Sequence, residues 1–210
     1  MNRSWRGKFL DDIIGNFIEE YAKHSHLDPT YGGAYYWNER EIQWALMSHL
    51  RDRMVSYSFG SRWWVHAEGS IVRPWFARRK EWPAPRRADI VLIDHSASRR
   101  WYKNFHDGKE TYYPDYEAMI ELKLFWSGQG SAYIKPFVEA DVRKLRSCLT
   151  DGKTNEAYQI VLDGLDRKGI PYLKGSYLER LKRGTKLQVF HWPDSEEPIQ
   201  DAKQAPYRVY

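Results

Sequence analysis

The chain has 210 residues, of which 42% are hydrophobic and 29% charged, and its 33 lysines and arginines against 28 aspartates and glutamates give a formal net charge of +5. This length predicts one domain over residues 1–210, and the composition excludes a disordered chain. The sequence has no apolar run near the ~20 residues that a bilayer requires, which excludes a membrane-spanning chain. The single cysteine, Cys148, excludes an intrachain disulfide and a thiolate zinc cluster. With no secretory signal visible at the start of the sequence, we expect a cytoplasmic protein.

Apolar spacing divides the chain into helices and strands. It predicts an N-terminal helix over about 8–24, which with the following loop forms an accessory segment, residues 1–35. Asn38 as N-cap and Glu41 three residues later predict a second helix that ends near Arg53. Three strands follow, which we expect to pair as a meander, then a helix, a strand, a helix and a strand. Their predicted ranges are 62–72, 88–94, 116–126, 135–149, 158–162, 171–182 and 185–192.

Two stretches are predicted to contain neither helix nor strand. Residues 95–115, between the second and third strands, predict a long loop with no signature of its role. The tail, residues 193–210, is polar and proline-spaced.

Charged residues stand in two strands that otherwise look buried. Because alternate strand residues face the same side, Glu121 and Lys123 share one face of the third strand. Asp89 opens the apolar run of the second strand, so Asp89 and Glu121 converge if these strands are neighbours. Two such oxygen ligands predict a Mg²⁺ site, which Mn²⁺ could also occupy, as in phosphoryl-transfer enzymes.

Asp89 followed by Glu121–Leu122–Lys123 resembles the PD-(D/E)XK nuclease superfamily over residues 36–192, with Ala88 where the family name has proline. The resemblance implies an α/β fold: a restriction-endonuclease-like αβββαβ core with a mixed central sheet flanked by helices. It further implies that Asp89, Glu121 and the Leu122 carbonyl hold the metal, and that Lys123 orients or activates water. For the family's helix glutamate we prefer Glu39, with Glu41 as the alternative.

The segment Asp141–Leu145 also resembles an acidic-to-Lys-Leu pattern of that superfamily. We interpret it instead as a solvated helix face, on which Asp141 and Lys144 form an ordinary i,i+3 pair.

A basic stretch precedes the second strand and predicts nucleic-acid binding, because guanidinium groups match phosphates and neighbouring tryptophans can stack on bases. Its residues are Arg73, Arg78, Arg79, Lys80, Arg86 and Arg87. Our hypothesis is a Mg²⁺-dependent nuclease, with DNA favoured over RNA. A non-catalytic nucleic-acid-binding or assembly module and a structural protein with aromatic interfaces remain alternatives. The sequence leaves endo- or exonuclease action open, and a homodimer or a partner protein is compatible with it.

Overall fold

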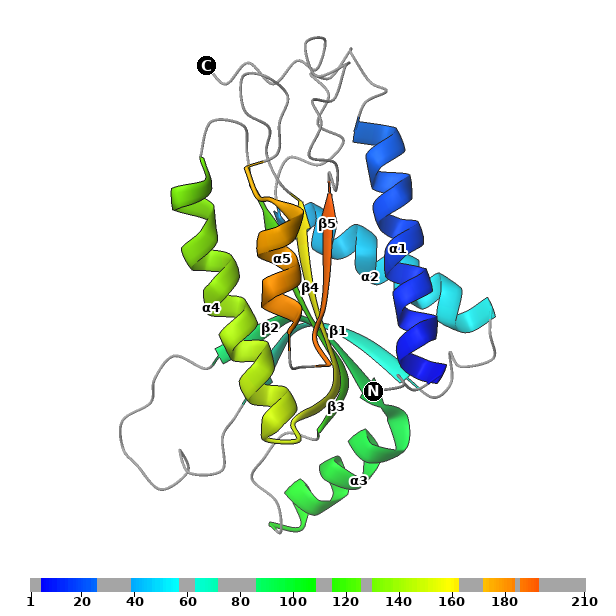
Figure 1. Ribbon diagram of the computed structural model, residues 1–210. Coiled ribbons are helices and arrows are strands. Elements are labelled where there is room, and N and C mark those ends of the chain that lie inside the picture. The colour runs from blue at the N-terminus through cyan, green and yellow to red at the C-terminus, as the bar shows by residue number, and fades with distance from the viewer. Residues whose placement is uncertain are drawn as a thin grey trace.

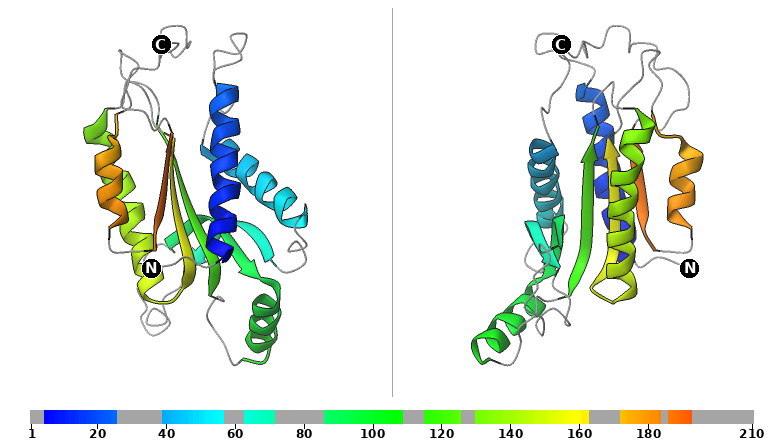
Figure 2. Two further views of the ribbon diagram at one scale, coloured as in Figure 1. Left: turned by 45° about the vertical axis from the view of Figure 1, so that its right-hand side comes forward. Right: turned by 90° about the vertical axis from the view of Figure 1, so that its left-hand side faces the viewer.

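The fold is an α/β sandwich of three layers. The computed structural model of the chain describes residues 5–25, 39–56, 63–71, 86–108, 115–125, 130–162, 172–183 and 186–192. One mixed sheet lies between a layer of α1 (Trp5–Ser25) and α2 (Glu39–Ser56) and a layer of α4 (Ser131–Thr150) and α5 (Gly175–Lys182), as Figures 1 and 2 show. The predicted tail 193–210, the loop after α1, Asn38 and Pro171 lie outside the described residues.

The sheet has five strands in the order β1-β2-β3-β4-β5. β1, β2 and β3 pair antiparallel, which confirms the predicted meander, whereas β3, β4 and β5 pair parallel. Parallel neighbours need a crossover connection, and α4 and α5 provide these two crossovers. The strands are Trp63–Ile71, Arg86–Asp94, Tyr116–Leu124, Thr154–Leu162 and Gln188–Trp192.

Each face of the sheet has its own apolar core. Ile120 and Leu122 of β3 pack toward α1 and α2, and Met119 packs toward α4 and α5. Leu10 and Ile14 of α1 are buried in the first core, so this helix is an integral layer of the fold. Glu121 and Lys123 alternate with Leu122 and therefore point to the α4 side.

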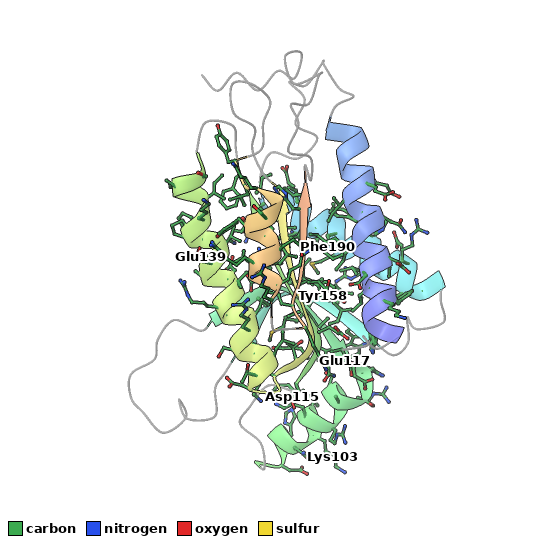
Figure 3. All side chains as sticks on the ribbon, viewed as in Figure 1. Lys103, Asp115, Glu117, Glu139, Tyr158 and Phe190 are labelled. Atoms are coloured by element: carbon green, nitrogen blue, oxygen red, sulfur yellow. The ribbon has the colours of Figure 1, made fainter. Side chains whose placement is uncertain are left out.

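The interior beneath α1 is closed by an aromatic contact between the last two strands. The rings of Tyr158 and Phe190 stack with their centroids 6.4 Å apart, and both lie at the centre of the molecule (Figure 3). Tyr158 Oη also donates a hydrogen bond to the Gly7 carbonyl at 3.3 Å. This contact ties the N-terminal helix to the sheet.

The prediction of a loop over residues 95–115 is wrong, because this segment contains α3 (His95–His106). Asp94 explains the helix: its Oδ1 accepts hydrogen bonds from the backbone N–H groups of Ser96 at 2.8 Å and Ala97 at 3.1 Å, which is the bonding of an N-cap. α3 projects away from the three layers (Figures 1 and 2).

Two other elements begin earlier than predicted. α4 starts at Ser131, after Gly130 with a φ of 76°, whereas the prediction began near residue 135 because it relied on the apolar spacing that starts at Phe137. β4 starts at Thr154, where Asn155 donates to Glu117 at 3.3 Å (Figure 3). None of the described helices is long and apolar enough to cross a membrane.

Candidate active site at the fork between β2 and β3

β2 and β3 separate beside Asp89. Backbone pairing between them runs from Leu92↔Ala118 to Ile90↔Ile120. One residue further, the Asp89 carboxylate takes the place of a backbone acceptor, since its Oδ2 accepts the Leu122 N–H at 2.7 Å. The two strands therefore diverge from this point, and we call the region between them the fork. The first hydrogen bond across the fork comes from the side chain of Asp89 instead of its backbone.

α2 secures the other side of the fork. The Gln43 side-chain amide donates a short hydrogen bond to the Asp89 carbonyl, and Gln43 is itself buried. This bond joins the backbone of β2 at Asp89 to α2, while the Asp89 side chain is held by its own bond to the Leu122 N–H. The sequence analysis did not single out Gln43.

Carboxylates and lysines from three elements meet in this fork. Lys144 Nζ lies 2.6 Å from Oε1 of Glu121 and 3.3 Å from Oδ1 of Asp141. Lys123 Nζ lies 3.2 Å from Oδ2 of Asp141 and 3.3 Å from Oε1 of Glu39. β3 provides Glu121 and Lys123, α4 provides Asp141 and Lys144, and α2 provides Glu39. Each lysine thus joins two carboxylates from different elements.

Glu39 stands at the first position of α2, where its other oxygen accepts the Leu124 N–H at 3.4 Å. The alternative, Glu41, is exposed on the outside of the same helix. The Glu39 side chain is 40% exposed, that of Lys123 is 19% exposed and that of Glu121 is 1% exposed. Solvent therefore reaches the cluster past Glu39, and exposure falls toward Glu121.

The interpretation of Asp141 and Lys144 as a solvated pair is wrong. Their i,i+3 contact exists, but only 13% and 17% of the two side chains are exposed, and both face the sheet. Their partners, Lys123 and Glu121, lie on β3. The charged face of α4 therefore completes the cluster.

Both lysines are charged. Burial alone would lower the pKa of Lys123, but the surrounding carboxylates, with Asp141 the strongest, outweigh burial and raise this pKa above the ordinary lysine value. Burial opposes the charge of Lys144 as well, and Glu121 more than compensates, so its pKa is also raised. Neither ammonium group is a proton acceptor near neutral pH.

The carboxyl groups shift in the direction that burial dictates. Burial and, after it, the charge of Asp89 raise the pKa of Glu121 to about 9, and Lys144 opposes this rise only in part. Burial also raises the pKa of Asp89 and of Glu39, against the opposing effect of Lys123. An added positive charge in the fork would favour the ionised form of all three groups.

The donors of the fork fit a hard divalent cation. Glu121 Oε1 and Asp141 Oδ2 are buried and accept no hydrogen bond of normal geometry, although a lysine ammonium lies near each. With all six groups ionised, four carboxylates and two ammonium groups leave two negative charges uncompensated. Oxygen donors of this kind suit Mg²⁺ and not zinc.

Across the described residues, no three carboxylate, imidazole or thiol groups form a ready cluster for a metal ion. Mg²⁺ usually takes only one or two carboxylates and keeps several of its waters, so it does not need such a cluster. The predicted third ligand, the Leu122 carbonyl, accepts a hydrogen bond from the Lys123 ammonium at 3.0 Å. Asp89, Glu121 and the Leu122 carbonyl are oxygen donors of the kind that such a cation takes, although a cation at Leu122 would displace Lys123 from this carbonyl. Asp141 is a further oxygen donor that the sequence analysis did not assign.

Of the predicted nucleic-acid-binding residues, the structure describes the side chain of Arg87 alone. It is exposed, and its carbonyl accepts the Lys144 ammonium at 2.8 Å, so it borders the fork. Arg86 begins β2. Arg73, Arg78, Arg79 and Lys80 lie outside the described residues.

Gln159 of β4 is a further buried polar residue beside Glu121, its partner in the parallel register. Its Nε2 lies 3.5 Å from the Glu121 carbonyl. A polar side chain within the otherwise apolar run 157–162 is a sequence signal, but the sequence analysis did not use it.

Comparison of the chain with protein-family models, with curated proteins and with solved structures finds no match.

Proposed function

We propose that the protein is a Mg²⁺-dependent nuclease of the PD-(D/E)XK type, built on a restriction-endonuclease-like αβββαβ core. The observation that carries the proposal is the fork itself: Asp89 bonds to the Leu122 N–H, and Glu121 and Lys123 flank that residue on the face that α4 covers. The order of helix, meander, helix and strand that surrounds the fork supports the same fold. DNA is the favoured substrate over RNA.

Asp89, Glu121 and the Leu122 carbonyl would hold the cation, with Asp141 as an additional oxygen donor. A divalent cation bound there would polarise the phosphodiester and lower the pKa of the attacking water. Because Glu39 is the more exposed partner of Lys123, a phosphate group would approach the fork from that side.

Lys123 has a narrower role than the family resemblance implies. Because carboxylates raise its pKa, it stays an ammonium group and cannot accept a proton from water. It can orient the water and stabilise the negative charge that develops on the phosphate. Glu39 and Asp141 contact its Nζ from two sides and so act as positioning residues.

Cleavage assays test the proposal directly. Purified protein is incubated with supercoiled plasmid, linear duplex, single-stranded DNA and RNA, each with Mg²⁺, Mn²⁺ or EDTA. We expect cleavage that EDTA abolishes and that Asp89→Asn, Glu121→Gln and Lys123→Met each reduce by at least about 10²-fold, the range of one lost electrostatic contact in a transition state. Glu41→Gln, an exposed acidic residue of the same helix as Glu39, is the matched control and should cleave like wild type.

Wild-type activity in any of the three site variants would overturn the assignment of that residue. The second candidate, a nucleic-acid-binding module without activity, is favoured by the finding that both lysines already compensate carboxylates in the fork. Folded protein that binds these substrates and cleaves none of them would support that candidate and reject the nuclease.

A further inference from the structure

α4 carries two exposed aromatic side chains next to each other. Tyr133 is 52% exposed and Phe137 is 46% exposed. Their ring centroids lie 5.1 Å apart, with the ring planes tilted by 53°. Single exposed aromatic residues are common on protein surfaces, but here two rings one turn apart form a continuous apolar patch.

The pair lies on the same face of α4 as the charged residues of the fork. At 3.6 residues per turn, positions 133, 137, 141 and 144 fall within about 80° of one another around the helix. Phe137 precedes Asp141 by about 6 Å along the axis and Tyr133 precedes it by about 12 Å. The patch therefore continues the line of Asp141 and Lys144 outward.

This line also follows the direction in which the fork opens. Glu121 contacts Lys144 and Lys123 contacts Asp141, so β3 and α4 run antiparallel along the site. The next turn of α4, which holds Phe137, lies at the end of β3 that Glu39 approaches. Glu39 is the most exposed member of the cluster, so the aromatic pair stands on the accessible side.

We propose that Tyr133 and Phe137 stack on unpaired bases, and that the substrate is therefore a single-stranded segment of nucleic acid. This inference rests on the proposed nuclease function and names the substrate class of that site. Aromatic rings stack on any base, because every base has a π-face. At about 3.4 Å per stacked nucleotide, the pair would contact bases two to four nucleotides from the bond held at the fork.

An exposed basic residue beside the fork is compatible with a polynucleotide as the occupant, and a bound divalent cation would offset the negative charge of the fork itself. Arg87 is exposed and lies beside the fork, because its carbonyl accepts a hydrogen bond from the Lys144 ammonium of α4. A polynucleotide lying along α4 would therefore pass Arg87 beside the fork and then the rings of Tyr133 and Phe137. In an intact duplex the base faces are stacked on each other and are not available to these rings.

Binding assays separate this inference from the proposed function. Fluorescence anisotropy measures the affinity of labelled oligo(dT) of about 20 nucleotides, and of a blunt duplex of the same length, in the Asp89→Asn background so that cleavage does not interfere. We expect Tyr133→Ala/Phe137→Ala to weaken oligo(dT) binding at least about tenfold and to change duplex binding less than about twofold. Tyr102→Ala, which removes a ring that is 60% exposed on α3, is the matched control and should change neither affinity.

Equal losses for both oligonucleotides, no loss for either, or no binding of oligo(dT) by the parent protein would overturn the inference. If the double variant instead abolishes a dimer seen by light scattering and leaves oligo(dT) binding intact, the pair is a protein contact and the inference fails. Cleavage by the wild type tests the proposed function separately. If the wild type cleaves and the double variant binds oligo(dT) normally, only the stacking role is rejected. Ring-dependent binding in a protein without cleavage keeps the stacking role and rejects the nuclease.

Discussion

Asp141 is the residue on which the two lysines of the fork converge. One oxygen lies 3.2 Å from Lys123 Nζ and the other lies 3.3 Å from Lys144 Nζ. Asp141→Asn keeps the shape of the side chain and removes its charge, so Lys123 loses the carboxylate with the largest effect on its pKa. We predict a fall of at least about tenfold in the rate of cleavage, measured on the substrate that the wild type cleaves best.

Arg143→Gln is the control for this prediction. Arg143 lies two residues further along α4 and is 70% exposed, so its loss should leave the cleavage rate unchanged. Equal rates in Asp141→Asn and wild type would remove α4 from the site and return Asp141 to the role of an ordinary helix residue.

Glu121 should make the stability of the cation-free protein depend on pH. Its pKa is about 9 in the folded protein and near the ordinary value of about 4.3 in the unfolded chain, so above that value the folded state holds a proton that the unfolded state has lost. The free energy of unfolding therefore decreases as pH rises through this window, by at most about 1.4 kcal/mol per pH unit. Burial lowers the pKa values of His49 and His66, so their effect is confined to lower pH.

Urea unfolding between pH 7 and 9 with EDTA present measures this effect. We expect wild-type stability to fall by about 1 kcal/mol per pH unit and Glu121→Gln, which has no charge to bury, to be nearly flat. A wild type as flat as the variant would mean that Glu121 is already ionised in the folded state and that Lys144 fully compensates its charge.

At the residue scale, the sequence analysis assigned four of the six charged groups of the fork, which are Glu39, Asp89, Glu121 and Lys123. The alternation of strand residues suffices to place Glu121 and Lys123 on one face. The predicted pairing of the second and third strands then brings Asp89 close to them. Asp141 and Lys144 could not be assigned in this way, because an i,i+3 pair is equally common on solvated helices. Their burial depends on how α4 crosses β3, which is a tertiary property.

At the scale of elements, the pairing of β1 with β2 depends on Gly69. A Cβ atom at this position would lie 2.3 Å from Cγ1 of Val91, which is closer than side-chain atoms approach each other. Gly69→Ala must therefore displace Val91 or separate the strands, and Val91 is two residues from Asp89. We predict a loss of about 1–3 kcal/mol in the free energy of unfolding, the usual cost of overpacking.

Val91→Ala provides the matched second variant. Removing both γ-carbons relieves the two closest contacts of the new methyl group and leaves only the Cβ of residue 91, at 2.9 Å, so Gly69→Ala/Val91→Ala should lose less stability than the sum of the two single variants. Strict additivity in urea unfolding would show that the two side chains do not compete for the same space.

The elements themselves could largely be predicted, and the exception has a local cause. The apolar periods predict both helical layers and all five strands of the described sheet. α3 was missed because its composition suggested a loop, although Asp94 followed by Ser96 is a normal N-cap pattern. α3 is strongly amphipathic although it is polar overall, so its helical spacing was a signal that the sequence analysis did not use.

At the scale of the whole molecule, the topology explains why the fork is where it is. The meander ends at β3, which lies at the middle of the sheet, and β3 then pairs parallel with β4 through the crossover α4. The same strand is thus the end of the antiparallel half and the start of the parallel half. β2 can diverge from it while α4 lies across the gap, so charged groups from both halves share one buried space.

That buried space carries two more negative than positive charges when all six groups are ionised, so a divalent cation should stabilise the entire domain. We predict that Mg²⁺ at 100 times its dissociation constant raises the free energy of unfolding by about 2.7 kcal/mol, which for a chain of this size corresponds to an increase in Tm of about 5–10 °C. Differential scanning calorimetry with Mg²⁺, with Na⁺ at matched ionic strength and with EDTA measures this directly and requires no substrate. Asp89→Asn/Glu121→Gln removes both predicted carboxylate ligands and should show no increase specific to Mg²⁺. An equal rise in Tm in this variant would place the cation elsewhere on the protein, and no rise in the wild type would mean that Lys123 and Lys144 already satisfy the carboxylates of the fork.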